Sequence, residues 1–105
     1  MTQPKIVEYI RYEVPAARAD AFVAAYAAAA KELDASVHCL AWEVSRGVEE
    51  PQNFIVRIEW DSVEGHEGGF RRSPGFRNFF AAVKPFFEQI REMKHYRVLA
   101  ARSRS

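Results

Sequence analysis

The sequence has little of what would mark a secreted, membrane-bound or strongly charged protein. Its 105 residues include one cysteine, which excludes an internal disulfide and a site with several cysteine ligands. The formal net charge of +1 gives no basic footprint for nucleic acid or an acidic membrane. The longest nearly uncharged stretch, residues 21–30, is too short to span a bilayer, and residues 1–5 lack the apolar run of a signal peptide. We expect a soluble, cytoplasmic protein with one domain over residues 1–105, in which residues 102–105 form a frayed tail.

The sequence also lacks the motifs of common nucleotide, metal and redox sites. It contains no Walker A loop, no GxGxxG, no HExxH and no CxxC. Its three histidines, His38, His66 and His95, stand alone, without the spacing of metal ligands. We therefore expect no metal and no organic cofactor. What the chain does have is an excess of aromatic residues, with eight Phe, four Tyr and two Trp.

Hydrophobic periodicity predicts four strands and two main helices. Segments rich in β-branched and aromatic residues predict strands over residues 6–14, 37–46, 53–60 and 93–101. Between the first two strands, the alanine-rich residues 16–34 predict a helix. The residues at helical spacing that should form its buried stripe are Phe22, Tyr26, Ala29 and Leu33.

A second, interrupted helical region is predicted after the third strand. Asp61 can cap a short helix, because Glu64 follows it at the spacing of a capping box. Ser73 and Pro74 begin the next helix, and Pro85 should interrupt it. The order β-α-β-β-α-β predicts an α+β, ferredoxin-like fold, in which helices cover one face of a four-stranded antiparallel sheet and the second helix is split.

Alternation along the strands predicts which residues face the helices and which lie on the open face of the sheet. The residues expected on the core face are Ile10, Tyr12, Val14, Leu40, Trp42, Val44, Phe54, Val56, Ile58, Trp60, Tyr96 and Val98. The residues expected on the open face are Val7, Tyr9, Cys39, Ala41, Ile55 and Leu99, mixed with Arg11, Glu13, Glu43, Arg57, Glu59, His95 and Arg97. Such a mixed surface favours a two-fold homodimer whose sheets pack face to face. The alternative is a solvated sheet with scattered apolar residues.

His66 is the predicted proton acceptor of a functional site. It follows Trp60 by six residues and lies on a glycine-flanked helix near the end of the core sheet. The alternative is a structural histidine, and His95 is expected in a salt bridge or interface. Three arginines follow His66: Arg71, Arg72 and Arg77. They are expected on the solvated surface of the helical region. The alternative is that they attract an anionic phenolate to the mouth of the site.

Six aromatic residues are predicted to converge between the sheet and the split helix. They are Tyr12, Trp42, Phe54, Trp60, Phe76 and Phe80. Flat walls of this kind suit a flat, conjugated ligand. The other aromatic residues at helical spacing in the split helix are expected mainly as core: Phe79, Phe86 and Phe87.

Over about residues 6–99 the sequence resembles the antibiotic biosynthesis monooxygenase (ABM) family of dimeric α/β-barrel proteins. The resemblance is carried by a strand that ends in Trp60, the Asp61-Ser-Val-Glu64 segment, His66, and the Ser73-Pro74 pair followed by Phe76. It implies a ferredoxin-like homodimer whose sheets pack together, with a pocket in each subunit between sheet and helices. In the branch that oxidises anthrones, Trp60 would match a pocket Trp, and His66 would fall at a polar pocket position.

The resemblance also separates the branches of the family. Its members include cofactor-independent oxygenases of anthrones and quinols, and haem-degrading enzymes. The haem branch uses an Asn, a Trp and a haem-ligating His. The position expected for that His falls near Phe80, and the first strand has no Asn, so haem degradation is not expected. Other polar pocket positions of the anthrone branch fall near Val56 and Phe80, which are apolar here.

The function predicted from these observations is a cofactor-independent monooxygenase that oxidises a flat phenolic, anthrone or hydroquinone substrate with O₂ as co-substrate. His66 would take the hydroxyl proton, Trp60 and Trp42 would form walls, and Tyr12 would hydrogen-bond a carbonyl. The alternative is a non-catalytic dimeric module that binds a small aromatic ligand. No membrane partner is expected, and no nucleic acid either, because single-stranded RNA would need exposed aromatic residues beside basic ones.

Overall fold

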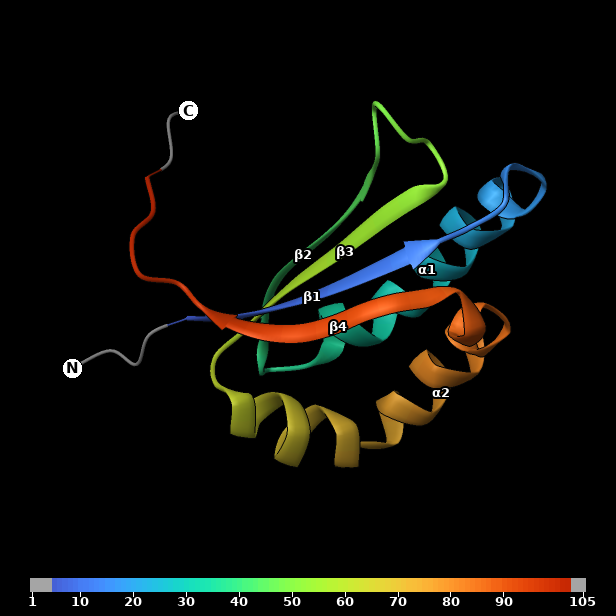
Figure 1. Ribbon diagram of the computed structural model, residues 1–105. Helices are drawn as coiled ribbons and strands as arrows, with labels where there is room; N and C mark the ends of the chain where they lie inside the picture. Colours follow the sequence, from blue (N-terminus) through green and yellow to red (C-terminus); the bar gives the residue numbers. More distant parts are fainter. Residues whose placement is uncertain (1–4, 103–105) are drawn as a thin grey trace.

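The computed structural model describes residues 5–102 and contains the predicted order of elements (Figure 1). The strands are β1 (Ile6–Glu13), β2 (Cys39–Arg46), β3 (Asn53–Trp60) and β4 (Ile90–Arg97). The main helices are α1 (Ala19–Ala35) and α2 (Pro74–Val83). Among the described residues, no helix is long and apolar enough to cross a membrane. Of the predicted frayed tail, residues 103–105 lie outside the described residues, and Arg102 is exposed.

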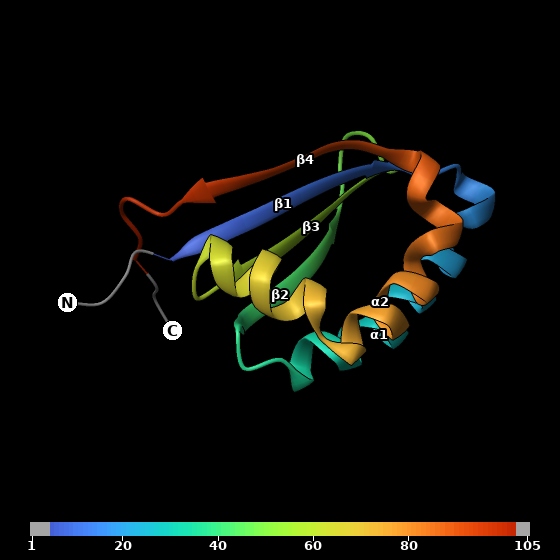
Figure 2. The same cartoon turned by 90° about the horizontal axis from the view of Figure 1, so that it is seen from below.

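The four strands form one antiparallel sheet in the order β2-β3-β1-β4. Figure 2 shows the sheet as one layer and the helices as a second layer on one of its faces. This arrangement confirms the predicted α+β, ferredoxin-like fold. It also sets the location of a site, because the inner face of the sheet and the helices enclose the aromatic side chains.

Helix α1 buries the stripe predicted from its spacing. Phe22, Tyr26 and Leu33 are at most 1% exposed, and they pack against the sheet in the core. The alanines between them suit the helical conformation, and Ala29 and Ala30 are buried with the stripe. A short 3₁₀ turn, Ala16–Arg18, precedes the helix.

The second helical region is split, as predicted, but its first part is a π-helix. Ser62, rather than the predicted Asp61, caps this part, because the Ser62 hydroxyl accepts a hydrogen bond from the backbone N–H of Gly65 at 2.8 Å. The π-helix spans Gly65–Gly69, and a 3₁₀ turn leads from it into α2. Helix α2 ends just before Pro85, where a 3₁₀ segment takes over and leads into β4.

The prediction for the last strand, residues 93–101, was wrong in its start, its end and its faces, because the strand spans Ile90–Arg97. The strand begins at Ile90 and carries a bulge at Arg91, since Ile90 pairs with Tyr12 and Glu92 with Arg11. One extra residue reverses which side chains face the helices. His95 is therefore opposite Glu8 on the core face.

The side chain that follows His95 lies on the other face. Tyr96 is on the open face, where its ring meets the edge of Tyr9 at 5.4 Å. Arg97 is opposite Ile6 on the core side, and Val98 lies beyond the end of the strand. The predicted positions of all four residues, His95 to Val98, are thereby corrected.

A second irregularity corrects the start of β2. Cys39 pairs with Trp60 and Ala41 with Glu59, so Leu40 is the extra residue of a bulge. Cys39 consequently packs against the core, whereas Leu40 is 51% exposed. The sequence had placed each of these two residues on the opposite face.

Candidate functional site

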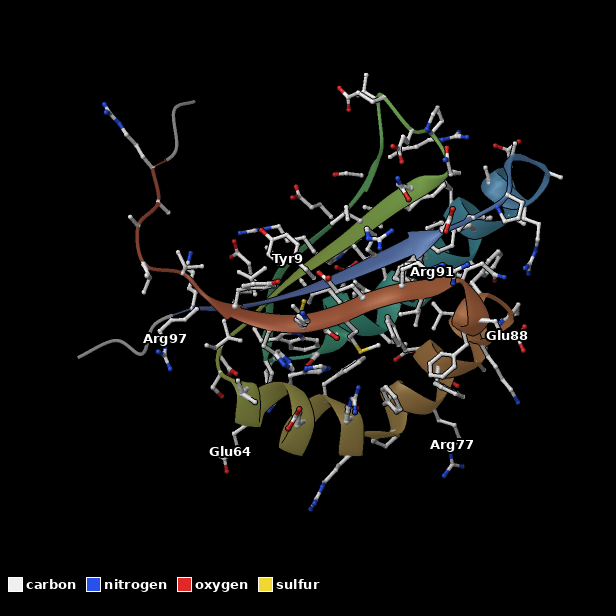
Figure 3. All side chains as sticks on the ribbon, viewed as in Figure 1. Tyr9, Glu64, Arg77, Glu88, Arg91 and Arg97 are labelled. Carbon is white, nitrogen blue, oxygen red and sulfur yellow. The ribbon has the colours of Figure 1, made fainter. Side chains whose placement is uncertain are left out.

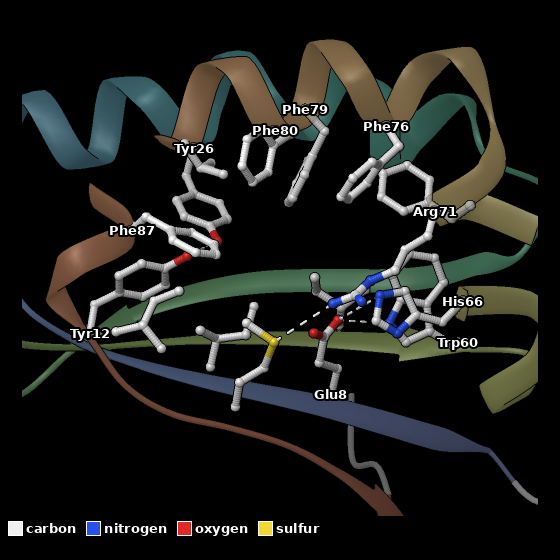
Figure 4. Close-up of a pocket in the computed structure, with 16 residues that line it drawn as sticks. Glu8, Tyr12, Tyr26, Trp60, His66, Arg71, Phe76, Phe79, Phe80 and Phe87 are labelled. Atoms are coloured by element: carbon white, nitrogen blue, oxygen red, sulfur yellow. Dashed lines mark hydrogen bonds and ion pairs between the residues drawn. The ribbon is translucent and has the colours of Figure 1, made fainter. Parts of the chain in front are cut away.

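A cavity of about 190 Å³ lies between the sheet and the helices (Figure 4). Strands β1, β3 and β4 form its floor, helices α1 and α2 form its roof, and the π-helix closes one end. The lining residues are Glu8, Ile10, Tyr12, Tyr26, Ile58, Trp60, His66, Phe70, Arg71, Phe76, Phe79, Phe80, Val83, Phe87, Ile90 and Met93. The walls are thus mainly aromatic and aliphatic, with a few polar groups.

The aromatic wall is a continuous series of ring contacts along the split helix. Phe76 lies 5.7 Å from Phe70 and 5.9 Å from Phe80, and Phe80 lies 5.6 Å from Phe87. Phe79, predicted as core, is buried and also lines the cavity. Edge and tilted geometries dominate these contacts, which leaves ring faces and edges available to a flat ligand.

Glu8 is the buried carboxyl group of the site. It projects from β1 on the same face as Ile10 and Tyr12 and is only 3% exposed. Trp60 donates its indole N–H to Glu8 Oε1 at 3.1 Å. Burial raises the pKa of Glu8 above its ordinary value of 4.5, although the hydrogen bond from Trp60 and the charge of Arg71 act in the opposite direction.

His66 is held in place on three sides. Its ring stacks on Trp60 with centroids 4.4 Å apart and planes 9° from parallel. Its Nδ1 is 2.8 Å from Nε2 of His95, so one of these two nitrogens donates to the other. Its Nε2 is 3.5 Å from Glu8 Oε1. Burial, followed by the positive charges of Arg71 and His95, lowers the pKa of His66 to about 3.

The two pKa shifts determine which group can take a proton. His66 is neutral near pH 7 because its pKa lies far below that value, so its contact with Glu8 is not a charged ion pair. An imidazole that resists protonation is a poor general base. A carboxylate whose pKa is raised is a better base than an ordinary one, because its affinity for a proton is greater. The directions of the two pKa shifts, together with the place of Glu8 in the cavity lining, favour Glu8 over His66 as a proton acceptor.

The opposite end of the cavity is closed by a pair of phenols. The hydroxyl oxygens of Tyr12 and Tyr26 are 2.7 Å apart. Burial raises the pKa of Tyr12 to about 12 and that of Tyr26 well above 10, so both remain protonated near pH 7. One hydroxyl proton is used between them, and the other can be donated to a ligand oxygen.

The three arginines after His66 have different positions. All three are exposed, but Arg71 lines the cavity, whereas Arg72 and Arg77 are not among the lining residues. Figure 3 shows Arg77 pointing away from the sheet. Only Arg71 is therefore placed to interact with a ligand.

Five of the seven predicted site residues come together here: Tyr12, Trp60, His66, Phe76 and Phe80. The other two lie outside the cavity lining. Trp42 donates its indole N–H to Asp34 at the end of α1, at 2.7 Å. Phe54 is buried against Phe22, with ring centroids 4.8 Å apart. Both residues contact α1 rather than the cavity.

The sequence analysis missed three polar residues of the site: Glu8, His95, and Tyr26, which was expected only in the buried stripe of the first helix. Glu8 occupies a core-face position of the first strand, and that unusual placement of a carboxyl group was the available signal. His95 was assigned to the wrong face because the bulge at Arg91 cannot be seen in the alternation. Among residues 5–102, no three acidic, His or Cys side chains gather in a way that could hold a metal ion.

Comparisons with known proteins agree with this architecture. The model of the antibiotic biosynthesis monooxygenase family matches residues 5–82. A Bordetella bronchiseptica protein that carries this family name has a similar structure, with 25% identity, a TM-score of 0.75, and coverage of 93% of this chain and 100% of that one. A second such protein, from Chloroflexus aurantiacus, has 17% identity, a TM-score of 0.74, and coverage of 94% and 97%, which shows the shared fold.

One curated relative also matches, the uncharacterized protein YczJ of Bacillus subtilis. It is 26% identical over 53 residues, and the match spans 50% of this chain and 56% of the relative. The family match covers most of the chain and includes Glu8, Trp60 and His66, and the solved relatives share the sheet and helices that enclose these residues. The chain belongs to the antibiotic biosynthesis monooxygenase family.

Proposed function

We propose that this protein is a monooxygenase that oxidises a flat phenolic, anthrone or hydroquinone substrate with O₂, without a metal or an organic cofactor. One observation carries the proposal: an aromatic cavity ends at a buried carboxyl group, Glu8, that Trp60 and His66 hold in place. Electron-rich phenolates reduce O₂ by themselves, so the protein needs only to bind the ring, remove a proton and exclude water. The family membership supports the reaction class.

Glu8 starts the reaction by accepting the hydroxyl proton of the substrate. The phenolate passes one electron to O₂, and the resulting radical and superoxide join through a new C–O bond. Glu8 gives its proton to the peroxide, and the carboxylate then accepts the hydrogen of that carbon as a proton while the O–O bond breaks. The hydroxide that leaves takes this second proton from Glu8 and becomes water. One oxygen atom of O₂ ends in the carbonyl product and the other in water.

The other side chains position the reactants. Trp60 donates to Glu8 and fixes the orientation of the carboxyl group, while neutral His66 stacks on Trp60 and keeps it in place. Phe76 and Phe80 hold the flat ring, and the hydroxyl proton that Tyr12 and Tyr26 leave free can bind a substrate carbonyl. His66 thus acts through its neighbours in this proposal.

Oxygen uptake tests the proposal. The protein is incubated with hydroquinones and anthrones in chelator-treated buffer, and ¹⁸O₂ is used to trace one atom into the product. Replacing Glu8→Gln keeps an acceptor for Trp60 but removes the base, so uptake should fall by about 10²-fold or more. Glu13→Gln is the matched control, because Glu13 lies on the same strand, is exposed and pairs with Arg91.

Two results would contradict parts of this assignment. Equal uptake by the wild type and Glu8→Gln would remove Glu8 from the mechanism. Binding of aromatic ligands without any oxygen uptake would favour the alternative function, a module that binds a small aromatic ligand and does not convert it. The small number of polar groups in the cavity is the observation that favours this alternative.

A further inference from the structure

Arg71 is the unpartnered charge of the cavity. It lines the cavity beside Glu8 and His66 and influences the pKa values of both groups. Within residues 5–102 it takes part in no ion pair, and its recorded hydrogen bond is a weak one to the sulfur of Met93 at 4.0 Å. A guanidinium group in this position offers several N–H donors to an anionic oxygen.

The charged groups of the cavity are gathered at one end, beside His66. Figure 4 shows Arg71, His66 and Glu8 together, whereas Tyr12 and Tyr26 lie at the far end. A ligand that meets both Arg71 and Glu8 must therefore carry its anionic group and its hydroxyl close together. Substituents on adjacent carbons of one ring satisfy this requirement.

The volume of the cavity limits the number of rings. An apolar cavity of about 150 Å³ holds one benzene molecule. The cavity of about 190 Å³ is larger than that. The extra volume can hold a few substituent atoms, but it cannot hold two more fused rings. The walls suit one substituted ring between the phenylalanines of α2 and the sheet.

We propose that the substrate is a single aromatic ring that carries a carboxylate next to a hydroxyl, with the carboxylate on Arg71 and the hydroxyl on Glu8. The inference rests on the proposed function for the fate of the hydroxyl, but ligand binding can be measured without any reaction. It replaces the three-ring anthrone with a one-ring hydroxybenzoate as the class of substrate.

Binding of unreactive probes by isothermal titration calorimetry tests this inference. The probe is 2-hydroxybenzoate, and the comparison ligands are its neutral isostere 2-hydroxybenzamide and the three-ring anthracene-2-carboxylate. We expect 2-hydroxybenzoate to bind most tightly. Arg71→Gln should weaken its binding by about tenfold and change binding of the amide by less than about twofold. Arg72→Gln is the matched control, since Arg72 is the exposed neighbour outside the cavity lining, and should alter neither.

The inference is overturned if the amide binds as tightly as the acid, if the three-ring acid binds best, or if Arg72→Gln has the effect of Arg71→Gln. Oxygen uptake with 2,5-dihydroxybenzoate separates it from the proposed function. Selective binding without uptake supports the carboxylate site and contradicts the monooxygenase. Uptake with neutral hydroquinones and no preference for the carboxylate supports the monooxygenase and contradicts the site.

Discussion

His66 links the stability of the fold to pH. Its imidazole is 4% exposed, stacks on Trp60, and has its pKa lowered from 6.5 to about 3. Below about pH 6.5 the unfolded chain takes up a proton at this residue, and the folded protein does not until the pH approaches the lowered value. The contribution of the neutral imidazole to the free energy of unfolding is therefore complete above about pH 6.5. It is lost as the pH falls from about 6.5 towards about 3.

The expected result is a smaller loss of stability on acidification in a variant without this imidazole. Between about pH 7 and about pH 5, the free energy of unfolding of the wild type should fall by about 1–2 kcal/mol more than that of His66→Gln. Urea unfolding at the two pH values measures both differences. Equal pH dependence in the two proteins would show that the folded state protonates His66 as readily as the unfolded state does.

Glu8 shows what could be predicted for single residues. Its position in the first strand matches that of Ile10 and Tyr12, so its place on the core face could be inferred from alternation alone. The residue that satisfies it could not be inferred, because Trp60 lies 52 residues away and meets it only through the register of β1 with β3. A buried carboxyl group without such a partner would be costly, and the partner appears only in the folded sheet.

At the level of elements, the π-helix packs closely against the His38–Asp61 pair. Nδ1 of His38 is 2.9 Å from Oδ2 of Asp61, and the backbone N–H of Asp61 donates to the carbonyl of His38 at 2.9 Å. A Cβ added to Gly69 would overlap the imidazole of His38, and one added to Gly65 would overlap the Asp61 carboxylate. The glycines thus let the segment that carries His66 approach the end of the sheet.

This contact predicts opposite effects for two neighbouring glycines. Gly69→Ala should destabilise the fold by about 1–3 kcal/mol, because His38 must move away from Asp61. Gly68→Ala is the matched control: its Cβ would make an ordinary contact of 3.6 Å with Glu64, and the unfolded chain would lose freedom. That variant should be more stable by about 0.4–1 kcal/mol. Thermal unfolding measures both, and a neutral Gly69→Ala would show that the π-helix is not tightly seated.

The elements were predictable where periodicity is regular and unpredictable where one residue interrupts it. The helical spacing of Phe22, Tyr26 and Leu33 was enough to predict α1. Pro85 was enough to predict where α2 is interrupted. The bulge at Arg91 inverted the faces of β4, since its position depends on how the preceding 3₁₀ segment enters the sheet. Because of this bulge, His95 lies on the core face, where its ring contacts His66.

At the scale of the whole molecule, the aromatic excess is divided between a core and a cavity. Phe22 on α1 and Phe54, which packs against it, fill the core, whereas Phe76 and Phe80 line the cavity. The sequence predicted the presence of the cavity from this excess. It could not predict the volume, because the volume depends on the distance between the split helix and the sheet.

The open face of the sheet is where we propose that two copies associate. Tyr9 and Tyr96 meet edge to face, and together with Ile55, Arg11 and Glu92 they surround a shallow hollow. Arg57 and Glu59 are joined at 2.9 Å beside them. Self-complementary patches of aromatic residues and paired charges are suited to a two-fold interface.

Sedimentation tests this association. The wild type should sediment with twice the chain mass of 12.0 kDa. Tyr96→Asp should raise the dimer dissociation constant by about 30-fold or more, because it removes the ring that packs against Tyr9 and adds a carboxylate beside Glu92 that a partner would have to bury. Val23→Asp is the matched control, since Val23 on α1 is 50% exposed and Tyr96 is 47% exposed, on opposite layers of the molecule. A wild type that stays monomeric would contradict the association and leave the sheet as a solvated surface. A control that dissociates equally would place the contact elsewhere.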